Sequence, residues 1–182
     1  MTPWSKMRAR FVSLMLAGAA LSLFASAPAG AFTGRLSIDV AGQKRSAVMV
    51  EPERLKRSPR TVVIVLHGAS NGSGRRIQSN LGLDEYLRSY GAVAVYPDAL
   101  DGGWNVTGRA GPDDPAFLRA LAAKLVADGI ADRRKIFLIG ASTGGMLALR
   151  VGCQAPDYLA GVGALIAGLP ATLAASCKPA PS

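Results

Sequence analysis

The stretch from residue 136 to 146 constrains the fold of this 182-residue chain more than any other. An apolar run leads into the pentapeptide Gly140-Ala141-Ser142-Thr143-Gly144, and the residues that follow favour a helix. A G-x-S-x-G sequence between a strand and a helix is typical of a sharp turn that holds the serine hydroxyl out at the carboxyl edge of a parallel sheet. The flanking glycines leave room for strand and helix to cross closely. The sequence therefore predicts that Ser142 is a nucleophile at such a turn, here called the elbow.

Strands and helices alternate along the rest of the chain. The runs 61–66, 92–96 and 135–139 are short, apolar and rich in β-branched residues, which indicates strands buried on both faces of a sheet. Alternating apolar residues between 35 and 50, interrupted at Ala41-Gly42, predict a hairpin, and 161–166 is a further candidate strand.

Three helices are expected between these strands. The first follows a polar loop over 69–76 and places Leu83, Leu87 and Tyr90 on one face. The second begins at Asp113 or Asp114 with Pro115 in its first turn, and the third covers 143–154. The apolar stripe of the second helix consists of Phe117, Leu118, Leu121 and Leu125. The pattern predicts an α/β fold in which helices cover both faces of a mostly parallel sheet.

Residues 1–31 have the composition of a secretory signal peptide. Lys6, Arg8 and Arg10 precede an apolar run over 11–24, and Ala29-Gly30-Ala31 fits a cleavage site. That run is shorter than the roughly 20 residues that span a bilayer. We therefore expect a secreted or periplasmic protein with its folded domain over 32–182 and no stable membrane insertion after cleavage; an uncleaved anchor is the alternative.

The charge pattern argues against a nucleic-acid partner. Removing residues 1–31 deletes three cations and no acid, which lowers the formal net charge from +9 to +6. The remaining cations are scattered, and clusters such as Arg75-Arg76 and 133–135 lack interleaved aromatic residues. These cations are interpreted as solvated surface charges.

Cys153 and Cys177 are the two cysteines of the chain. Export to an oxidising compartment predicts a disulfide between them, and two free buried thiols are the alternative. The chain has no C-x-x-C and no cysteine-histidine spacing of the kind that binds zinc, so no metal site is expected.

Nucleophilic attack by Ser142 on a carbonyl carbon requires donors for the oxygen on which negative charge develops. At an elbow, one donor is the backbone N–H of the next residue, here Thr143. The second donor is expected from the loop after an earlier strand, His67-Gly68-Ala69, with the N–H of Ala69 as the best candidate.

Several motifs in the same order resemble one protein family. The motifs are Val65-Leu66-His67-Gly68, Tyr96-Pro97-Asp98-Ala99, Gly103-Trp104-Asn105, Asp113-Asp114 with Ala116-Phe117, Asp132-Arg133 and the stretch from Gly140 to Met146. Residues 35–170 are similar to the secreted poly(3-hydroxybutyrate) depolymerase and feruloyl esterase-like family of α/β-hydrolases. The resemblance implies hydrolysis of carboxylic esters without a cofactor, acting on polyester oligomers, feruloylated sugars or smaller esters.

The chain departs from this family after the elbow. The resemblance implies an acid and a histidine on later strands, yet Asp157 is the single acid after Ser142 and no histidine follows it. The later strands are therefore expected to be missing, and Asp157 is interpreted as a surface turn residue. His67, the one histidine of the chain, is a candidate surrogate base, and a role in shaping its loop is the alternative.

Two further hypotheses stay open at this point. The chain could be a non-catalytic remnant or binding protein of hydrolase fold, or a serine peptidase of related fold. Trp104 is interpreted either as a surface on which an aromatic or sugar group stacks or as a buried anchor of its loop.

Overall fold

The computed structural model describes residues 32–52, 59–68, 72–108, 111–175 and 177. The predicted signal peptide over 1–31 and the oxyanion candidate Ala69 lie outside the described residues. Among the helices described, none combines the length and the apolar character needed to cross a bilayer.

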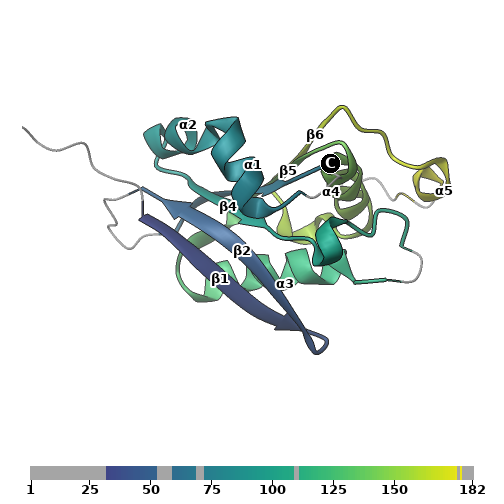
Figure 1. The fold of residues 1–182 in the computed structure, drawn as a ribbon, viewed down its shortest axis with the longest axis horizontal. Helices are drawn as coiled ribbons and strands as arrows, with labels where there is room; N and C mark the ends of the chain where they lie inside the picture. The colour runs from purple at the N-terminus through teal and green to yellow at the C-terminus, as the bar shows by residue number, and fades with distance from the viewer. Residues whose placement is uncertain (1–31, 53–58, 69–71, 109–110, 176, 178–182) are drawn as a thin grey trace, which may run out of the picture.

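A six-stranded sheet forms the centre of the protein, with strand order β1-β2-β4-β3-β5-β6 (Figure 1). The strands are β1 (Phe32–Val40), β2 (Gln43–Glu51), β3 (Arg60–Leu66), β4 (Val93–Pro97), β5 (Ala131–Ala141) and β6 (Gly161–Leu165). Strands β4, β3, β5 and β6 are parallel to one another, whereas β1 and β2 form a hairpin and β2 pairs with β4 in antiparallel orientation. The predicted mostly parallel sheet is confirmed.

The hairpin turns where the sequence predicts it. Ala41 and Gly42 both have positive φ, at 52° and 76°, as two-residue hairpin turns require to match the twist of the strands. The Asp39 carboxylate supports the turn by accepting a hydrogen bond of 3.0 Å from the Gly42 N–H.

Helices cover both faces of the sheet, as predicted. Helices α3 (Asp114–Ala127) and α4 (Thr143–Gln154) pack against one face, and α1 (Gly74–Leu81) and α2 (Leu83–Ser89) pack against the other (Figure 1). Three short elements complete the fold: η1 (Leu100–Gly102), η2 (Pro156–Tyr158) and α5 (Ala171–Ala174). The larger core lies between the sheet and α3 with α4.

The segment before β4 differs from the prediction. The expected loop over 69–76 ends earlier, because Ser73 caps α1 by accepting a hydrogen bond of 3.2 Å from the Arg76 N–H. The left-handed backbone of Gly82 (φ 59°) then separates α1 from α2. Leu83 and Leu87 pack on the core as expected. The placement of Tyr90 on that apolar face is wrong, since it follows the end of α2 and is 72% exposed.

The structure decides which of two acidic residues begins α3, a choice that the sequence left open. Asp113 is the cap, and its carboxylate accepts a hydrogen bond of 3.0 Å from the Ala116 N–H. Asp114 turns inward and is completely buried. The predicted apolar stripe of Phe117, Leu118, Leu121 and Leu125 is buried as well.

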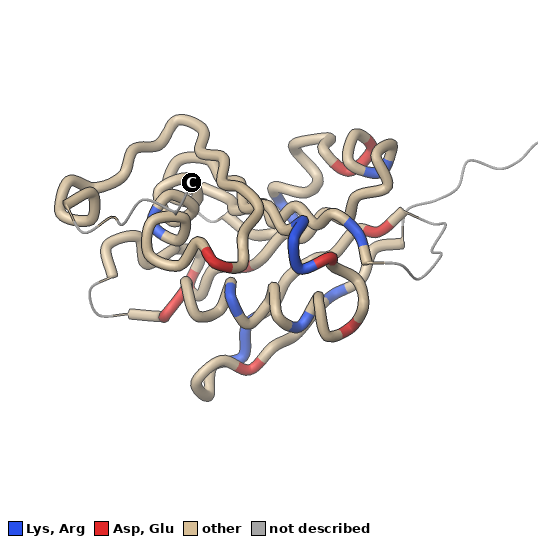
Figure 2. Tube along the Cα trace, turned by 180° about the vertical axis from the view of Figure 1, so that it is seen from behind, with Lys and Arg blue, Asp and Glu red and all other residues tan. Residues whose placement is uncertain are grey.

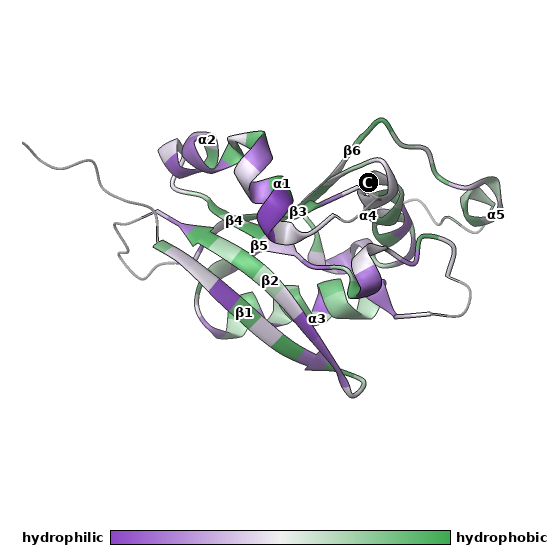
Figure 3. Ribbon diagram, viewed as in Figure 1, coloured by the Kyte–Doolittle hydropathy of each residue, from purple (hydrophilic) through white to green (hydrophobic). Residues whose placement is uncertain are grey.

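The end of the sheet at β6 presents apolar side chains on the surface. Leu165 and Ile166 are exposed, and Phe137 and Val162 are partly so. Figure 3 shows that the segment running from β6 towards α5 is coloured as hydrophobic. Strand β6 carries no charged residue. An edge strand without charged residues is prone to pair with another strand, because its outer backbone N–H and C=O groups have no partner strand.

Cys153 at the end of α4 and Cys177 after α5 form a disulfide, with 4.9 Å between their Cα atoms. The predicted pairing is therefore present.

Candidate active site

Ser142 lies between β5 and α4 in the backbone conformation of an elbow. Its φ of 52° and ψ of −124° are unusual for a residue with a side chain, and such conformations persist only where neighbouring structure enforces them. Here the Ser142 N–H donates to the Leu165 carbonyl at 3.0 Å, and the Ser142 carbonyl accepts from the Met146 N–H at 2.9 Å. The serine side chain makes no capping hydrogen bond to α4. The Ser142 backbone is thus held in place by hydrogen bonds, while its hydroxyl does not cap α4.

Glycines allow the strands and the helix to meet closely around Ser142. A Cβ at Gly140 would lie 2.7 Å from the Gly145 nitrogen, and one at Gly144 would lie 2.9 Å from the Leu66 carbonyl carbon. Gly68, after β3, lies next to Ser142, because a Cβ there would be 3.4 Å from the Ser142 Cβ. The end of β3 therefore lies directly beside the elbow.

We expect Gly144→Ala to destabilise the protein by roughly 1 to 3 kcal/mol, the usual range for a side chain forced into a closely packed site. The new methyl group would press on the backbone carbonyls of Leu66 and His67, which cannot move without shifting β3. Urea denaturation measures the effect. Gly103→Ala is the control, since a Cβ at Gly103 meets nothing within 4 Å, and equal losses for the two variants would contradict the prediction.

The predicted oxyanion donor Thr143 is the first residue of α4. Backbone N–H groups in the first turn of a helix have no acceptor within the helix and form the positive end of its dipole. They are therefore suited to binding a negative oxygen. The Thr143 Oγ1 atom is buried without a hydrogen-bond partner among the described residues.

His67 is buried at the carboxyl end of β3, which pairs with β5. Its Nδ1 lies 2.7 Å from the Gly68 carbonyl oxygen, and its Nε2 accepts a hydrogen bond of 3.3 Å from the Ala99 N–H. Both ring nitrogens thus contact backbone groups of the surrounding loops. This arrangement favours the loop-shaping interpretation of His67 over the surrogate base.

Trp104 is 7% exposed, so its ring is not presented to a substrate. The indole Nε1 donates to the His67 carbonyl at 2.8 Å, and the two rings lie 4.8 Å apart between centroids. The interpretation of Trp104 as a buried loop anchor is therefore the one that fits.

A buried ion pair holds the loop after Trp104, and the sequence analysis missed it. Arg45 on β2 contacts Asp114 at 2.6 Å, with both side chains almost fully buried. The second Asp114 oxygen accepts from the Asn105 N–H at 2.6 Å, while Arg150 on α4 donates to the Asn105 carbonyl at 2.7 Å. The available signal was that Arg45 is a charged residue within a strand of alternating apolar residues. Alternation does not by itself say which face of the sheet such a residue occupies.

Asp157 lies in η2, after the end of α4. It forms two hydrogen bonds with the Arg119 guanidinium, of 2.6 and 2.8 Å, and this pairing lowers the pKa of the Asp157 carboxyl. Because the 12 residues of α4 span about 18 Å, the carboxylate is far from Ser142 at the other end of the helix. Figure 2 shows basic and acidic residues interspersed along the chain.

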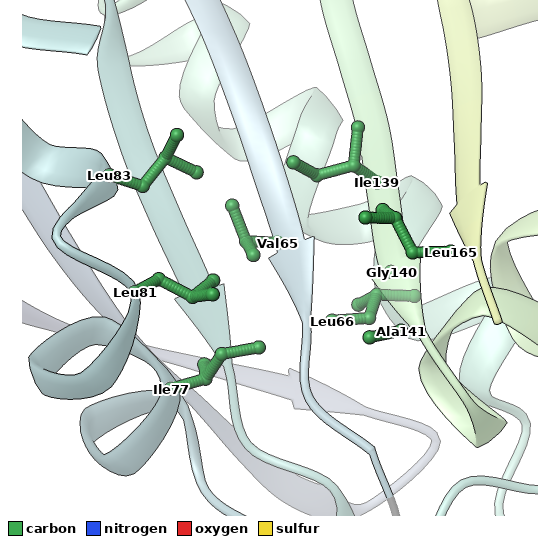
Figure 4. A pocket seen from close by; sticks show the side chains of 9 residues that line it. All are labelled: Val65, Leu66, Ile77, Leu81, Leu83, Ile139, Gly140, Ala141 and Leu165. Atoms are coloured by element: carbon green, nitrogen blue, oxygen red, sulfur yellow. The ribbon is translucent and has the colours of Figure 1, made fainter. Parts of the chain in front are cut away.

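An apolar cavity of about 200 Å³ lies beside the elbow, between α1, α2 and the sheet (Figure 4). It is lined by Val65, Leu66, Ile77, Leu81, Leu83, Ile139, Gly140, Ala141 and Leu165. Ala141 directly precedes Ser142 in the chain, and the carbonyl of Leu165 accepts the Ser142 N–H. An apolar group in this cavity would therefore lie close to Ser142.

The residues described contain no group of three or more histidine, cysteine, aspartate or glutamate side chains that could hold a metal ion.

Comparison with known proteins finds proteins of similar sequence and proteins of similar fold. The protein named "Putative esterase NocK" from Nocardia uniformis subsp. tsuyamanensis is 31% identical, over 78% of this chain and 43% of its own length. The fluorophosphonate-binding serine hydrolase FphF of Staphylococcus aureus matches with a TM-score of 0.61 and 14% identity, over 72% of this chain and 55% of that chain. The acetyl xylan esterase from Aspergillus awamori matches with a TM-score of 0.61 and 19% identity, over 72% of this chain and 53% of that chain.

The chain thus spans about half the length of the relatives it matches. A family model described as the alpha/beta hydrolase family matches residues 62–181. This match includes most of β3, the elbow and α4, and it covers well over half of the chain. The protein belongs to the alpha/beta hydrolase family.

Proposed function

We propose that this chain carries the nucleophile and oxyanion donors of an exported serine esterase. In this proposal residues 1–31 are a signal peptide that is removed on export, and 32–182 form a partial hydrolase domain. Ser142 attacks the carbonyl carbon of a carboxylic ester, and the backbone N–H groups of Thr143 and Ala69 bind the oxygen that becomes negative. The observation that carries the proposal is the fixed backbone of Ser142 at the head of α4, with its hydroxyl free of the helix.

The substrate class follows from the resemblance and the cavity. The motifs resemble polyhydroxyalkanoate depolymerases and feruloyl esterases, and an acetyl xylan esterase shares the fold. A cavity of about 200 Å³ lined by apolar side chains suits the apolar part of an acyl group. We therefore propose carboxylic esters with an apolar acyl or aromatic portion as substrates.

Neither Asp157 nor His67 is placed to act as the general base for Ser142. Asp157 lies beyond the far end of α4, and both ring nitrogens of His67 contact backbone groups. A serine hydrolase without its histidine loses about a million-fold in turnover, and what is left comes from binding and the oxyanion donors. We therefore expect this chain by itself to hydrolyse esters very slowly. The same observation favours a second candidate function, a non-catalytic protein that binds esters.

Chemical rescue distinguishes these candidates. Free imidazole can act as the general base in solution. In an intact active site a general base raises the reaction rate by about 10²- to 10⁴-fold. We expect 4-nitrophenyl butyrate to acylate Ser142, as detected by mass spectrometry of the intact protein, with imidazole raising the rate by at least about 10-fold. Ser142→Ala should remove the acylation, and Ser37→Ala, on β1, should leave it unchanged. Without acylation at Ser142 in the presence of imidazole, the esterase proposal fails and the binding protein is favoured.

A further inference from the structure

A second pocket, here called the α3 pocket, lies between α3, β5 and η2 and has a volume of about 550 Å³. It is separate from the elbow. Ser142 follows the carboxyl end of β5, whereas Ile136 lies near the middle of that strand, about 20 Å away at the usual rise of a strand. The lining side chains are Arg119, Ala122, Ala123, Val126, Ala127, Arg133, Ile136, Asp157 and Tyr158.

Much of the α3 pocket is apolar, because α3 presents small side chains to it. Ala123 and Ala127 are exposed, one helical turn apart, and Val126 beside them is partly buried. Ala122 and Ile136 are 2% and 1% exposed, so they form the buried base of the pocket. An apolar chain lying here would cover surface that is now in contact with water, which favours binding.

One wall of the α3 pocket is held in place by an ion pair. The two carboxylate oxygens of Asp157 accept hydrogen bonds of 2.6 and 2.8 Å from the Arg119 guanidinium. The same guanidinium lies 4.8 Å from the centre of the Tyr158 ring. The Ala160 N–H donates to the Ile136 carbonyl at 2.7 Å and ties the segment after η2 to β5. The wall is therefore formed without a ligand, and the charge of Asp157 is already balanced.

Arg133 brings a further positive charge to the α3 pocket. Its side chain is exposed and makes no ion pair with a residue that the structure describes. The carboxylate of the adjacent Asp132 is used elsewhere, since it accepts from the Arg134 N–H at 2.9 Å and lies 3.9 Å from Lys135. A guanidinium binds a carboxylate through two parallel hydrogen bonds. The pocket thus combines an apolar base with one cation that an anionic ligand can pair with.

We propose that the α3 pocket binds a monocarboxylate with an apolar chain, such as a fatty acid of medium length. Arg133 pairs with the carboxylate, and the chain lies over Ala123, Ala127 and Ile136. A neutral ester lacks the charge that Arg133 recognises, so the pocket distinguishes a free acid from an ester. Because the site lies apart from Ser142, this inference does not depend on the proposed function.

Titration of the ¹⁵N-labelled protein with octanoate, followed by NMR, measures both the affinity and the place of binding. We expect saturable binding with a Kd of about 1 mM, the strength typical of a small flexible ligand. The amide signals of Ala123 and Ala127 should shift, whereas those of Leu81 and Leu83 at the cavity beside the elbow should not. Binding that does not saturate, or shifts confined to Leu81 and Leu83, would overturn the proposal.

Two further ligands separate the contribution of the charge from that of the chain. Octan-1-ol has the chain without the charge, and acetate has the charge without the chain. We expect each to bind at least about 10-fold more weakly than octanoate, because each lacks one of the two contacts. Equal affinity for octanoate and octan-1-ol would show that the pocket does not recognise the anion and would overturn the proposal.

Arg133→Gln removes the cation and should weaken octanoate binding by about 10-fold, with no change for octan-1-ol. Arg133→Lys keeps the charge without the paired hydrogen bonds and should retain part of the affinity. Arg134→Gln is the matched control, since it makes the same change at the next residue, which does not line the pocket. Equal losses in Arg133→Gln and Arg134→Gln would assign the effect to the general positive charge of the surface and would overturn the proposal.

Discussion

Asp114→Ala is expected to destabilise the folded protein by about 3 to 5 kcal/mol, the range found when one partner of a buried ion pair is removed. The change leaves the Arg45 guanidinium buried with its partner gone, and it also removes the acceptor for the Asn105 N–H. The ring of Phe117 lies 4.0 Å from the guanidinium and stabilises a cation only weakly by comparison. Urea denaturation followed by circular dichroism measures the loss.

The control for this prediction lies at the other end of α3, where Asp128 is the C-cap. Lys124 and Asp128 form an exposed ion pair at 2.9 Å, and Asp128→Ala should cost less than about 1 kcal/mol because water replaces the lost partner. The double variant Arg45→Met with Asp114→Leu should recover much of the stability, since no charge is then left buried. A loss in Asp114→Ala no larger than that in Asp128→Ala would contradict the prediction.

Removing the disulfide is expected to have the next largest effect on stability. Cys153 and Cys177 are 24 residues apart, and a crosslink that closes a loop of this size contributes about 3 kcal/mol by restricting the unfolded chain. The loop contains β6, the edge strand of the sheet with exposed apolar residues. We therefore expect reductant to shift the urea midpoint of the parent to lower concentration.

The double variant Cys153→Ser/Cys177→Ser provides the control for reduction. It should unfold at the midpoint of the reduced parent and should not respond to reductant. Equal midpoints for the oxidised and reduced parent would show that the crosslink does not restrict the unfolded chain as expected.

Most elements of the fold could be predicted because their signals are local. The hairpin at Ala41-Gly42, the cap and apolar stripe of α3, and the passage from β5 through Ser142 into α4 all depend on residues adjacent in sequence. The error at Tyr90 has a local cause as well. Helix α2 ends at Ser89 and Tyr90 is its C-cap, so helical periodicity carried past that end no longer places Tyr90 on the apolar face.

The contacts around the candidate site could not be predicted in the same way. Arg45 reaches Asp114 across 69 residues, and Trp104 reaches the His67 carbonyl across 37 residues. Spacing along the chain carries no information about such pairs. The sequence offered His67 as either a base or a loop-shaping residue, and the hydrogen bonds of its ring distinguish these roles because they use both nitrogens.

The amino-acid sequence by itself determined the class of fold and the position of the elbow. The spacing of apolar residues, the helix caps and the glycines that allow close packing are all patterns within a few residues of the chain. Tertiary structure alone decided which side chains surround Ser142. Trp104 and Ala99 lie 37 and 32 residues from His67 in the sequence, yet Trp104 donates to the His67 carbonyl and Ala99 donates to the His67 ring. Contacts of this kind arise only when separate loops fold against the end of β3, so local sequence patterns do not reveal them.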